Sequence, residues 1–358
     1  MRRSRVQIEA LLGTSDRLGK RDGSALLRTP DSTLFRYGFA KMTEPHSSAP
    51  HTADEFDPFA GGEVARVVPT TEPQREIWLA AKMQPEASLA YNESVTITLR
   101  GALDEPALRT ALDDLLVAHE ALRATVSPDG LQLLISTQAS VALPVVNLAH
   151  LVPANQDEVL AEVRRRHVLE PFDLELGPLF RAELLRLSSD RHALLLSAHH
   201  IVCDGWSFGV LVQDLARFYT ARVTDAVASI DMKSTGFGGY AEDRAQFSAS
   251  DEYVELERYW LAQISEHQVV LDLPTDHERS APRSYRSERE DGSIAPELLD
   301  QVRKSGAAQG SSLFVTLLAA FAVLMHRLSG QRDFIVGVPA AGAALLRRIL
   351  DGWLRNRP

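Results

Sequence analysis

The sequence is poor in cysteine and in long apolar runs. Cys203 is the single cysteine among 358 residues, so no disulfide can form within the chain, and a reducing compartment is favoured. No stretch reaches the roughly 20 apolar residues that a membrane-spanning helix needs. The basic N-terminus is followed only by the short apolar cluster Ile8–Leu12, which is too brief for a signal peptide. We therefore expect a cytoplasmic protein with no membrane partner.

The chain also lacks an excess of basic residues. Its formal net charge is -10, with 38 lysines and arginines against 48 aspartates and glutamates. Nucleic-acid-binding surfaces usually carry a basic excess, so this balance argues against a nucleic acid as the partner. The hydrophobic fraction of 45% is that of an ordinary globular protein, and 358 residues suffice for two lobes.

Composition divides the chain into four parts. Residues 1–64 are rich in proline, serine, glycine and acidic residues, so we predict a disordered leader or linker there. Residues 65–272 form the predicted first lobe, and residues 293–358 form the second. The segment between them, 273–292, is rich in proline and charge and is predicted to connect the lobes.

Hydrophobic periodicity predicts strands and helices in both lobes, which indicates an α/β or α+β fold. Thr71 and Gln74 have the spacing of a capping box, and Asp104 stands where it can cap a second helix. The predicted strands of the first lobe cover 94–99, 131–135, 180–184 and 192–200, and the last two are expected to pair as a hairpin across the turn Ser188-Ser189-Asp190. The other predicted helices of this lobe cover 156–168, 208–218 and 252–266.

In the second lobe the pattern predicts helices over 296–305 and 313–328. The latter is capped by Ser311 or Ser312 and is apolar on nearly all sides, so we expect it to be buried. It should end at Gly330, and a buried strand should follow at 333–339.

One stretch combines apolar and ionisable residues in an unusual way. SAHHIVCDGWS, Ser197 to Ser207, follows the apolar run Ala193–Leu196 and brings together two histidines, an aspartate and a glycine. Buried imidazoles and carboxylates are costly to desolvate. Neighbouring side chains of a strand point to opposite faces, so His199 and His200 cannot easily bind one metal ion. Since a catalytic site usually needs three protein ligands, we predict no metal site.

Two interpretations of the histidines follow from their chemistry. A histidine that projects from a strand end into a cleft can act as a general base, because its pKa lies near neutrality. The alternative is a hydrogen-bonded structural histidine, and we favour this for His199. Cys203 is expected to be a small buried side chain rather than a nucleophile.

The residues after the histidines are expected to form a strand-to-helix corner. Asp204 could be an ordinary turn carboxylate, but at such a corner we expect it to be buried and paired with an arginine. Gly205 permits a tight corner and the close approach of a ligand. Ser207 suits the N-cap of the following helix.

These residues carry a resemblance to a known family. His199-His200-Ile201-Val202-Cys203-Asp204-Gly205 fits the HHxxxDG motif of the condensation domains of non-ribosomal peptide synthetases. Other acyltransferases of the chloramphenicol acetyltransferase-like superfamily share that motif. Further segments resemble the condensation family in the same order: Thr71–Trp78, His119–Arg123, Pro171–Leu174, Gly177–Arg181, Tyr240–Ala241, Tyr259–Trp260, Leu273–Asp276 and Phe334–Pro339. The resemblance runs from about Val67 to Gly342.

The resemblance implies two chloramphenicol acetyltransferase-like lobes in a V, with the active site in the tunnel between them. The donor would be an acyl or peptidyl thioester and the acceptor an aminoacyl thioester, each carried on the phosphopantetheine of a carrier protein. An amide bond would form between them in the biosynthesis of a secondary metabolite. The domain itself would bind no cofactor, and its partners would be the donor and acceptor carrier proteins and other synthetase modules.

The resemblance also implies roles for single residues. His200 would be the catalytic histidine, which orients or deprotonates the attacking amine. Asp204 would be structural, with Arg123 as its candidate partner. The residues expected to support the site are His199, Asp204, Gly205 and Arg123, and those expected to line the channel include Gly205, Trp206 and Ser207.

The sequence departs from the family in two places. After Gly342 it reads AALLRRILDGWLRNRP, whereas the family continues with further strands, and Ala343 stands where the family has an arginine. We therefore expect an incomplete second lobe. Two alternatives to an active condensation enzyme stay open: a truncated, inactive remnant that only docks carrier proteins, and a free-standing acyltransferase that uses a soluble thioester.

Overall fold

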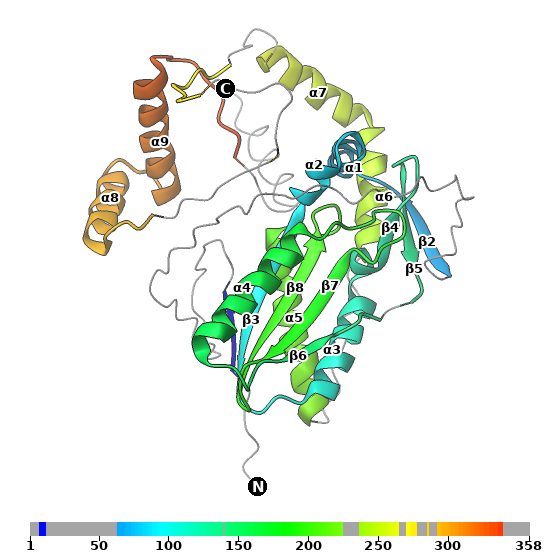
Figure 1. Cartoon of the computed structure of the whole chain (residues 1–358). Helices are drawn as coiled ribbons and strands as arrows, with labels where there is room; N and C mark the ends of the chain where they lie inside the picture. The colour runs from blue at the N-terminus through cyan, green and yellow to red at the C-terminus, as the bar shows by residue number, and fades with distance from the viewer. Residues whose placement is uncertain are drawn as a thin grey trace. The chain divides into compact units, whose positions relative to one another are not determined.

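The computed structural model describes residues 7–11, 63–138, 140–224, 236–264, 270–277, 285 and 292–338 (Figure 1). These residues fall into two compact units, which divide between Ser250 and Asp251. Helices and strands occur together in the first unit, as the sequence predicts for a mixed α and β fold.

The first unit is built on a five-stranded sheet. The strand order is β1 (Gln7–Leu11), β3 (Asn92–Arg100), β8 (Arg191–His199), β7 (Phe180–Arg186) and β6 (Val145–Asn147). All neighbours are antiparallel except β6 and β7, which are parallel. The predicted hairpin is confirmed, since β7 and β8 are adjacent in sequence and paired in the sheet.

Helices cover both faces of this sheet (Figure 1). Alternating side chains explain the two faces, because successive residues of a strand point to opposite sides. Leu194 and Leu196 of β8 pack in the larger core cluster, to which α3 (Glu105–Ala118) and α5 (Gly205–Thr224) contribute buried residues such as Leu112 and Leu215. Leu195 packs in a second cluster with Val163 of α4 (Pro153–Leu169). The sheet is therefore buried on both sides.

A smaller sheet has the order β2 (Val64–Pro69), β5 (Gln132–Ser136) and β4 (Ala124–Val126). Helices α1 (Glu72–Met83) and α2 (Pro85–Leu89) follow β2 in the chain, and the short 3-10 helix η1 (Glu120–Arg123) precedes β4. Helix α6 (Gly236–Ser248) packs against β2. Helix α6 is not predicted from the sequence, because its glycine-rich first turn carries little helical signal.

Two predicted helix starts are confirmed. The capping box of α1 is present, with Gln74 Oε1 2.9 Å from the backbone nitrogen of Thr71. Asp104 caps α3, because its Oδ1 accepts the backbone N–H of Ala107 at 2.9 Å. Both contacts satisfy polar groups that a helix N-terminus leaves without intrahelical partners.

The second unit, in its described part, holds three helices: α7 (Asp251–Ile264), α8 (Pro296–Ala308) and α9 (Leu313–Ser329). Ser312 caps α9 by accepting the N–H of Val315 at 3.2 Å, and α9 ends at Gly330, whose φ is 72°. Both boundaries agree with the sequence. Helices α8 and α9 pack closely, since a Cβ placed on Gly306 would lie 2.0 Å from Thr316 Oγ1.

Two predictions for this unit are wrong. Helix α9 is not buried: within its described length Met325 alone is buried, whereas Phe314 and Phe321 are exposed. The stretch 333–338 is not a strand, and Ile335 is exposed as well. Apolar composition predicts burial only where another element covers the residues, and a strand also needs a partner for its backbone groups. No described strand pairs with 333–338.

The described part of the predicted leader contains strand β1, whose register places Ile8 opposite Leu99 of β3. This pairing differs from the disordered leader expected there, and the rest of residues 1–62 lies outside the described part. The two compact units divide after Ser250, which precedes the boundary expected at 272. Most of the expected connector, 273–292, lies outside the described residues.

No single helix in the described part of the chain combines the length and apolar character that a membrane-spanning segment requires. Helices α8 and α9 have the required length and apolar character only when they are taken together, and the chain bends by 100° between them.

The structure predicts a large difference between two apolar positions of α3. Leu112 is 0% exposed in the core, whereas Val117 on the same helix is 44% exposed. Replacing Leu112 by alanine removes buried contacts and leaves a cavity, so we expect the free energy of unfolding to fall by about 2–5 kcal/mol. Val117→Ala is the control and should change it by less than about 0.5 kcal/mol. Equal effects in urea denaturation would contradict this packing of α3.

Candidate active site

The two histidines lie where β8 ends and α5 has not yet begun. Antiparallel pairing places Asn92 of β3 opposite His199, and Glu93 opposite Ala198. His200 is the next residue after β8, and its backbone N–H donates to the carbonyl oxygen of Tyr91 at 2.8 Å. Strand pairing therefore continues for one residue beyond β8 and fixes His200 beside the segment Tyr91–Glu93.

His199 lies in the interior, with 0% of its surface exposed. Its Nδ1 accepts the backbone N–H of Ile201 at 3.2 Å, and its Nε2 lies 3.4 Å from Ser88 Oγ. The rings of Tyr91 and Phe172 pack around it. Burial lowers the pKa of His199 to about 4, so the ring is neutral at neutral pH. These contacts are those of a structural histidine.

His200 is more accessible, with 36% of its side chain exposed. Its Nδ1 lies 2.7 Å from Oε1 of Glu93, which is within hydrogen-bonding distance. The angle at the ring nitrogen does not meet the geometry of a hydrogen bond, so the contact is a close charge pair. The ring stacks on Tyr91, with centroids 6.3 Å and planes 11° apart. Glu93 raises the pKa of His200, and partial burial opposes this effect. The pKa values of the two adjacent histidines are thus shifted in opposite directions.

Gln74 supports the loop that follows the histidines. Its Nε2 donates to the carbonyl oxygen of Ile201 at 2.8 Å, while its Oε1 accepts the hydroxyl of Thr71 at 3.0 Å. The side chain is buried, where an unpaired amide would be costly. The Thr71–Trp78 segment therefore stabilises the histidine loop directly, a role that the capping-box spacing did not reveal.

The structure corrects the expectation for Asp204, which is exposed rather than buried against an arginine. Its Oδ1 accepts the backbone N–H of Ser207 at 2.8 Å and the Ser207 hydroxyl at 2.5 Å. In return, the N–H of Asp204 donates to Ser207 Oγ at 3.2 Å. Asp204, and not Ser207, therefore caps α5, and the positive end of the helix dipole stabilises its carboxylate without an arginine.

The predicted pair of Arg123 and Asp204 is also wrong. Arg123 Nε donates to the carbonyl oxygen of Leu116 at 2.8 Å, and its Nη1 donates to that of Ser136. These carbonyl groups belong to α3 and to the end of β5. Arg123 satisfies local backbone acceptors in this way, so its guanidinium serves the fold around η1.

The neighbours of Arg123 in the same segment also hold helices together. His119 Nε2 lies 2.9 Å from Asp214 Oδ2 on α5, and Glu120 Oε2 accepts the N–H of Gly238 on α6 at 3.0 Å. The segment His119–Arg123 therefore positions the helix that begins beside the histidine loop.

The other candidate residues differ in their surroundings. Gly205 is exposed, and a Cβ placed on it would meet no described atom within 4 Å, so the fold itself does not require glycine there. Trp206 is 64% exposed. Cys203 is buried, and burial raises the pKa of its thiol, so the reactive thiolate is disfavoured.

A buried polar network lies on the opposite face of the sheet, beneath α4. His167 Nδ1 is 2.6 Å from Ser197 Oγ, and His167 Nε2 is 3.0 Å from Glu183 Oε2. The hydrogen bond from His167 lowers the pKa of Glu183, with a further contribution from Arg166. All of Ser197, His167 and Glu183 are buried, so this serine has no access to a substrate and the network attaches α4 to the sheet.

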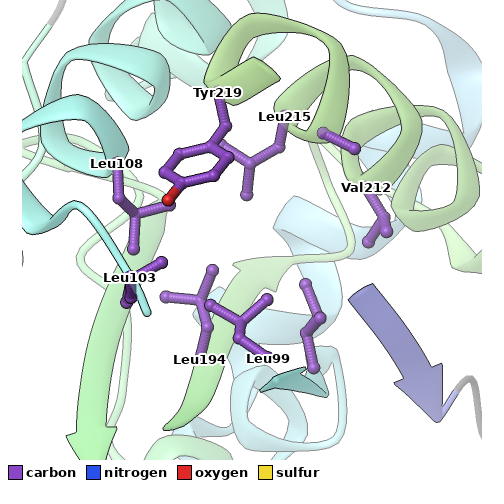
Figure 2. Close-up of a pocket in the computed structure, with 9 residues that line it drawn as sticks. Leu99, Leu103, Leu108, Leu194, Val212, Leu215 and Tyr219 are labelled. Atoms are coloured by element: carbon purple, nitrogen blue, oxygen red, sulfur yellow. The ribbon is translucent and has the colours of Figure 1, made fainter. Parts of the chain in front are cut away.

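A pocket between the large sheet and the helices α3 and α5 is shown in Figure 2. Its lining is aliphatic apart from Tyr219, whose hydroxyl accepts the N–H of Asp104 at 3.0 Å. Leu99 in this lining stands at the opposite end of β3 from Glu93. The pocket holds no reactive group and belongs to the core. Within the residues described, no three His, Cys, Asp or Glu side chains gather as a metal site would require.

Fold and motif together define a class of protein. The sheet carries a hairpin that ends at two histidines, and Asp204-Gly205 follow at the start of a helix. This arrangement is the one found in the chloramphenicol acetyltransferase-like acyltransferases. Residues 64–344 match the family model described as the condensation domain. The chain therefore belongs to the condensation-domain family of the non-ribosomal peptide synthetases.

Curated relatives with similar sequences are large synthetases. The chain is 36% identical over 286 residues to chondramide synthase cmdD of Chondromyces crocatus, and 32% identical over 294 residues to a linear gramicidin synthase of Brevibacillus parabrevis. These matches cover 78% and 81% of this chain but only 7% and 6% of the relatives. The chain thus spans a small part of the length of the proteins it matches.

Solved structures are similar as well. The starter condensation domain of rhizomide synthetase RzmA, in complex with C8-CoA and Leu-SNAC, superposes with a TM-score of 0.63 at 25% sequence identity. That match covers 76% of this chain and 61% of the solved chain. The first condensation domain of the calcium-dependent antibiotic synthetase superposes with a TM-score of 0.61 at 22% identity and so supports the fold alone.

The opposite pKa shifts of the two histidines predict opposite effects of pH on stability. His199 is neutral in the fold, so the stability it contributes is present above its unfolded pKa of about 6.5 and is lost as the pH falls toward 4. The complete loss is on the order of 3 kcal/mol. In His199→Gln the free energy of unfolding should therefore depend less steeply on pH between 6.5 and 4.

His200 provides the matched comparison. Its pKa is raised in the fold, so the stability from its charged form is present below 6.5 and is lost as the pH rises through the raised value. His200→Gln should thus cost more stability at pH 5.5 than at pH 8.5. Urea denaturation of both variants between pH 4 and pH 8.5 tests these predictions. If the free energy of unfolding depends on pH in the same way in both variants, the assigned environments are contradicted.

Proposed function

We propose that the chain catalyses amide-bond formation between a donor acyl or peptidyl thioester and the amine of an acceptor aminoacyl thioester. The single observation that supports this most is His200, an accessible imidazole at the end of β8 whose Nδ1 is 2.7 Å from a carboxylate. A carboxylate at one ring nitrogen leaves the other nitrogen of the neutral imidazole as the proton acceptor. An imidazole in this state can act as a general base, which supports the proposal.

The proposed step balances as an acyl transfer. The acceptor amine attacks the donor carbonyl carbon, the new C–N bond forms, and the C–S bond of the donor thioester breaks. His200 orients the amine and takes the proton that the nitrogen loses, and the proton passes to the departing thiolate. Holding both substrates in position can itself supply much of the rate, since effective molarities of oriented reactions reach about 10⁵ M or more.

The remaining site residues support His200 in this proposal. His199 packs the loop from inside, and Asp204 fixes the start of α5 through its cap on Ser207. Gly205 and Trp206 are exposed beside the loop, where a glycine leaves room for a substrate arm and an indole can contact it. The location of the site in a tunnel between two lobes stays a prediction of the family resemblance.

We further propose that both substrates arrive on phosphopantetheine arms of donor and acceptor carrier proteins of a synthetase assembly, and that the chain binds no cofactor of its own. Family membership supports this proposal. The similar RzmA domain, with C8-CoA and Leu-SNAC as its two ligands, supports a site for two substrates at once.

The first test is product formation by the 358-residue chain. Donor- and acceptor-loaded carrier proteins are mixed with the purified protein, and the mass of the acceptor carrier is measured intact. We expect an added mass equal to the donor acyl group, lost in His200→Ala. Trp206→Ala is not a suitable control because it belongs to the proposed site, whereas Val117→Ala on the exposed side of α3 should retain full activity.

Three outcomes would overturn the proposal. Equal product with His200→Ala would exclude the histidine as the catalytic group. No product from wild-type protein that melts cooperatively would favour a chain that only docks carrier proteins. Product from soluble thioesters, at rates that carrier attachment does not increase, would favour the free-standing acyltransferase instead.

A further inference from the structure

Glu93 reaches His200 because of the register between two strands. Glu93 lies opposite Ala198, and residues 93, 95, 97 and 99 of β3 share one face of the sheet. The even-numbered residues of β8 share that face, and His200 continues their sequence beyond the end of the strand. Val95 and Ile97 on this face are buried in the core, whereas Glu93 stands at its open end. A carboxylate at this position is unusual for a core-facing row.

Three contacts from one short segment hold His200, two of them on its imidazole and one on its backbone. Oε1 of Glu93 lies 2.7 Å from Nδ1, the ring of Tyr91 stacks on the imidazole, and the Tyr91 carbonyl oxygen accepts the backbone N–H of His200 at 2.8 Å. The side chain of His200 is thus fixed on one edge and one face. About a third of each partner of the ion pair is exposed, so Glu93 and His200 are both accessible to a substrate.

Other ionisable groups near His200 are few and identifiable. Asp204 acts on it only through its charge, since its carboxylate is engaged by Ser207. His199 is neutral and buried, and Cys203 is a buried thiol. Among the described residues that face His200, Glu93 is therefore the carboxylate that makes direct contact with the ring.

We propose that Glu93 is a positioning residue of this site, which keeps a proton on Nδ1 of His200 so that Nε2 exchanges the proton of the reaction. The inference rests on the proposed function of His200. Without Glu93 the neutral ring could carry its proton on either nitrogen, and only one of the two forms would accept a proton through Nε2. Glu93 does not itself contact the reacting atoms in this scheme, and so it is distinct from the catalytic group.

The test is a pH titration of His200 in the full chain, followed by NMR of protein labelled with ¹⁵N-histidine. His200→Gln assigns the signals among the 11 histidines. In wild-type protein we expect the ¹⁵N signals of the neutral His200 ring to show that Nδ1 carries the proton and Nε2 does not. In Glu93→Gln, which keeps the size of the side chain, the titration midpoint of His200 should move to lower pH and the preference for Nδ1–H should weaken.

A matched control separates this effect from a general change of charge. Glu162→Gln removes an exposed carboxylate that pairs with Arg165 on α4, and it should leave the His200 titration unchanged. Glu93→Asp keeps the charge, so the titration midpoint of His200 in this variant should lie between those of Glu93→Gln and wild-type protein. An unchanged midpoint and proton position in folded Glu93→Gln protein would overturn the inference.

The readout does not depend on turnover. If His200→Ala leaves product formation intact, the proposed function fails while the NMR result for Glu93 stands as a local electrostatic fact. If His200 is essential but Glu93→Gln leaves its titration unchanged, the role of Glu93 fails while the proposed function stands.

Discussion

The antiparallel pairing of β3 with β8 is the constraint on which the candidate site depends. It sets Glu93 opposite Ala198 and carries His200 one residue past the strand end, against the carbonyl oxygen of Tyr91. A shift of the register by one residue would turn the side chains of one strand to the opposite face. Buried leucines on both faces of β8 and the two helix layers around the sheet make such a shift costly, and so the core fixes the geometry of the site.

The same strand end gives two identical side chains different chemistry. His199 points into the interior, where burial keeps it neutral. The backbone N–H of Ile201 and the hydroxyl of Ser88 contact its two ring nitrogens. His200, on the opposite face, is half-exposed and faces a carboxylate. One histidine therefore stabilises the loop and the other is available for proton transfer. This division of roles follows from the alternation of a strand and needs no metal or cofactor in its explanation.

Local sequence signals predicted local structure well and long-range contacts poorly. The caps at Asp104 and Ser312, the helix stop at Gly330 and the hairpin were all visible as short patterns, since each depends on neighbours in the chain. The contact of Glu93 with His200 depends on a register between distant strands, which periodicity does not specify. The environment predicted for Asp204 was wrong because its carboxylate accepts the N–H of nearby Ser207 at the start of α5 and has no arginine partner among the described residues. The burial of α9 was overpredicted because apolar composition says nothing about what covers a helix.

The central claim is that a charge-paired His200 accepts a proton during amide formation. The most direct measurement is the single-turnover rate of product formation against pH with pre-loaded carrier proteins, in wild-type and Glu93→Gln protein. The amine of the acceptor titrates equally in both, so any difference belongs to the protein. We predict a rate that rises with pH through a midpoint above 6.5 in wild-type protein, and a midpoint at lower pH in Glu93→Gln, because the raised pKa of His200 depends first on Glu93. Superimposable profiles for the two proteins would contradict the account.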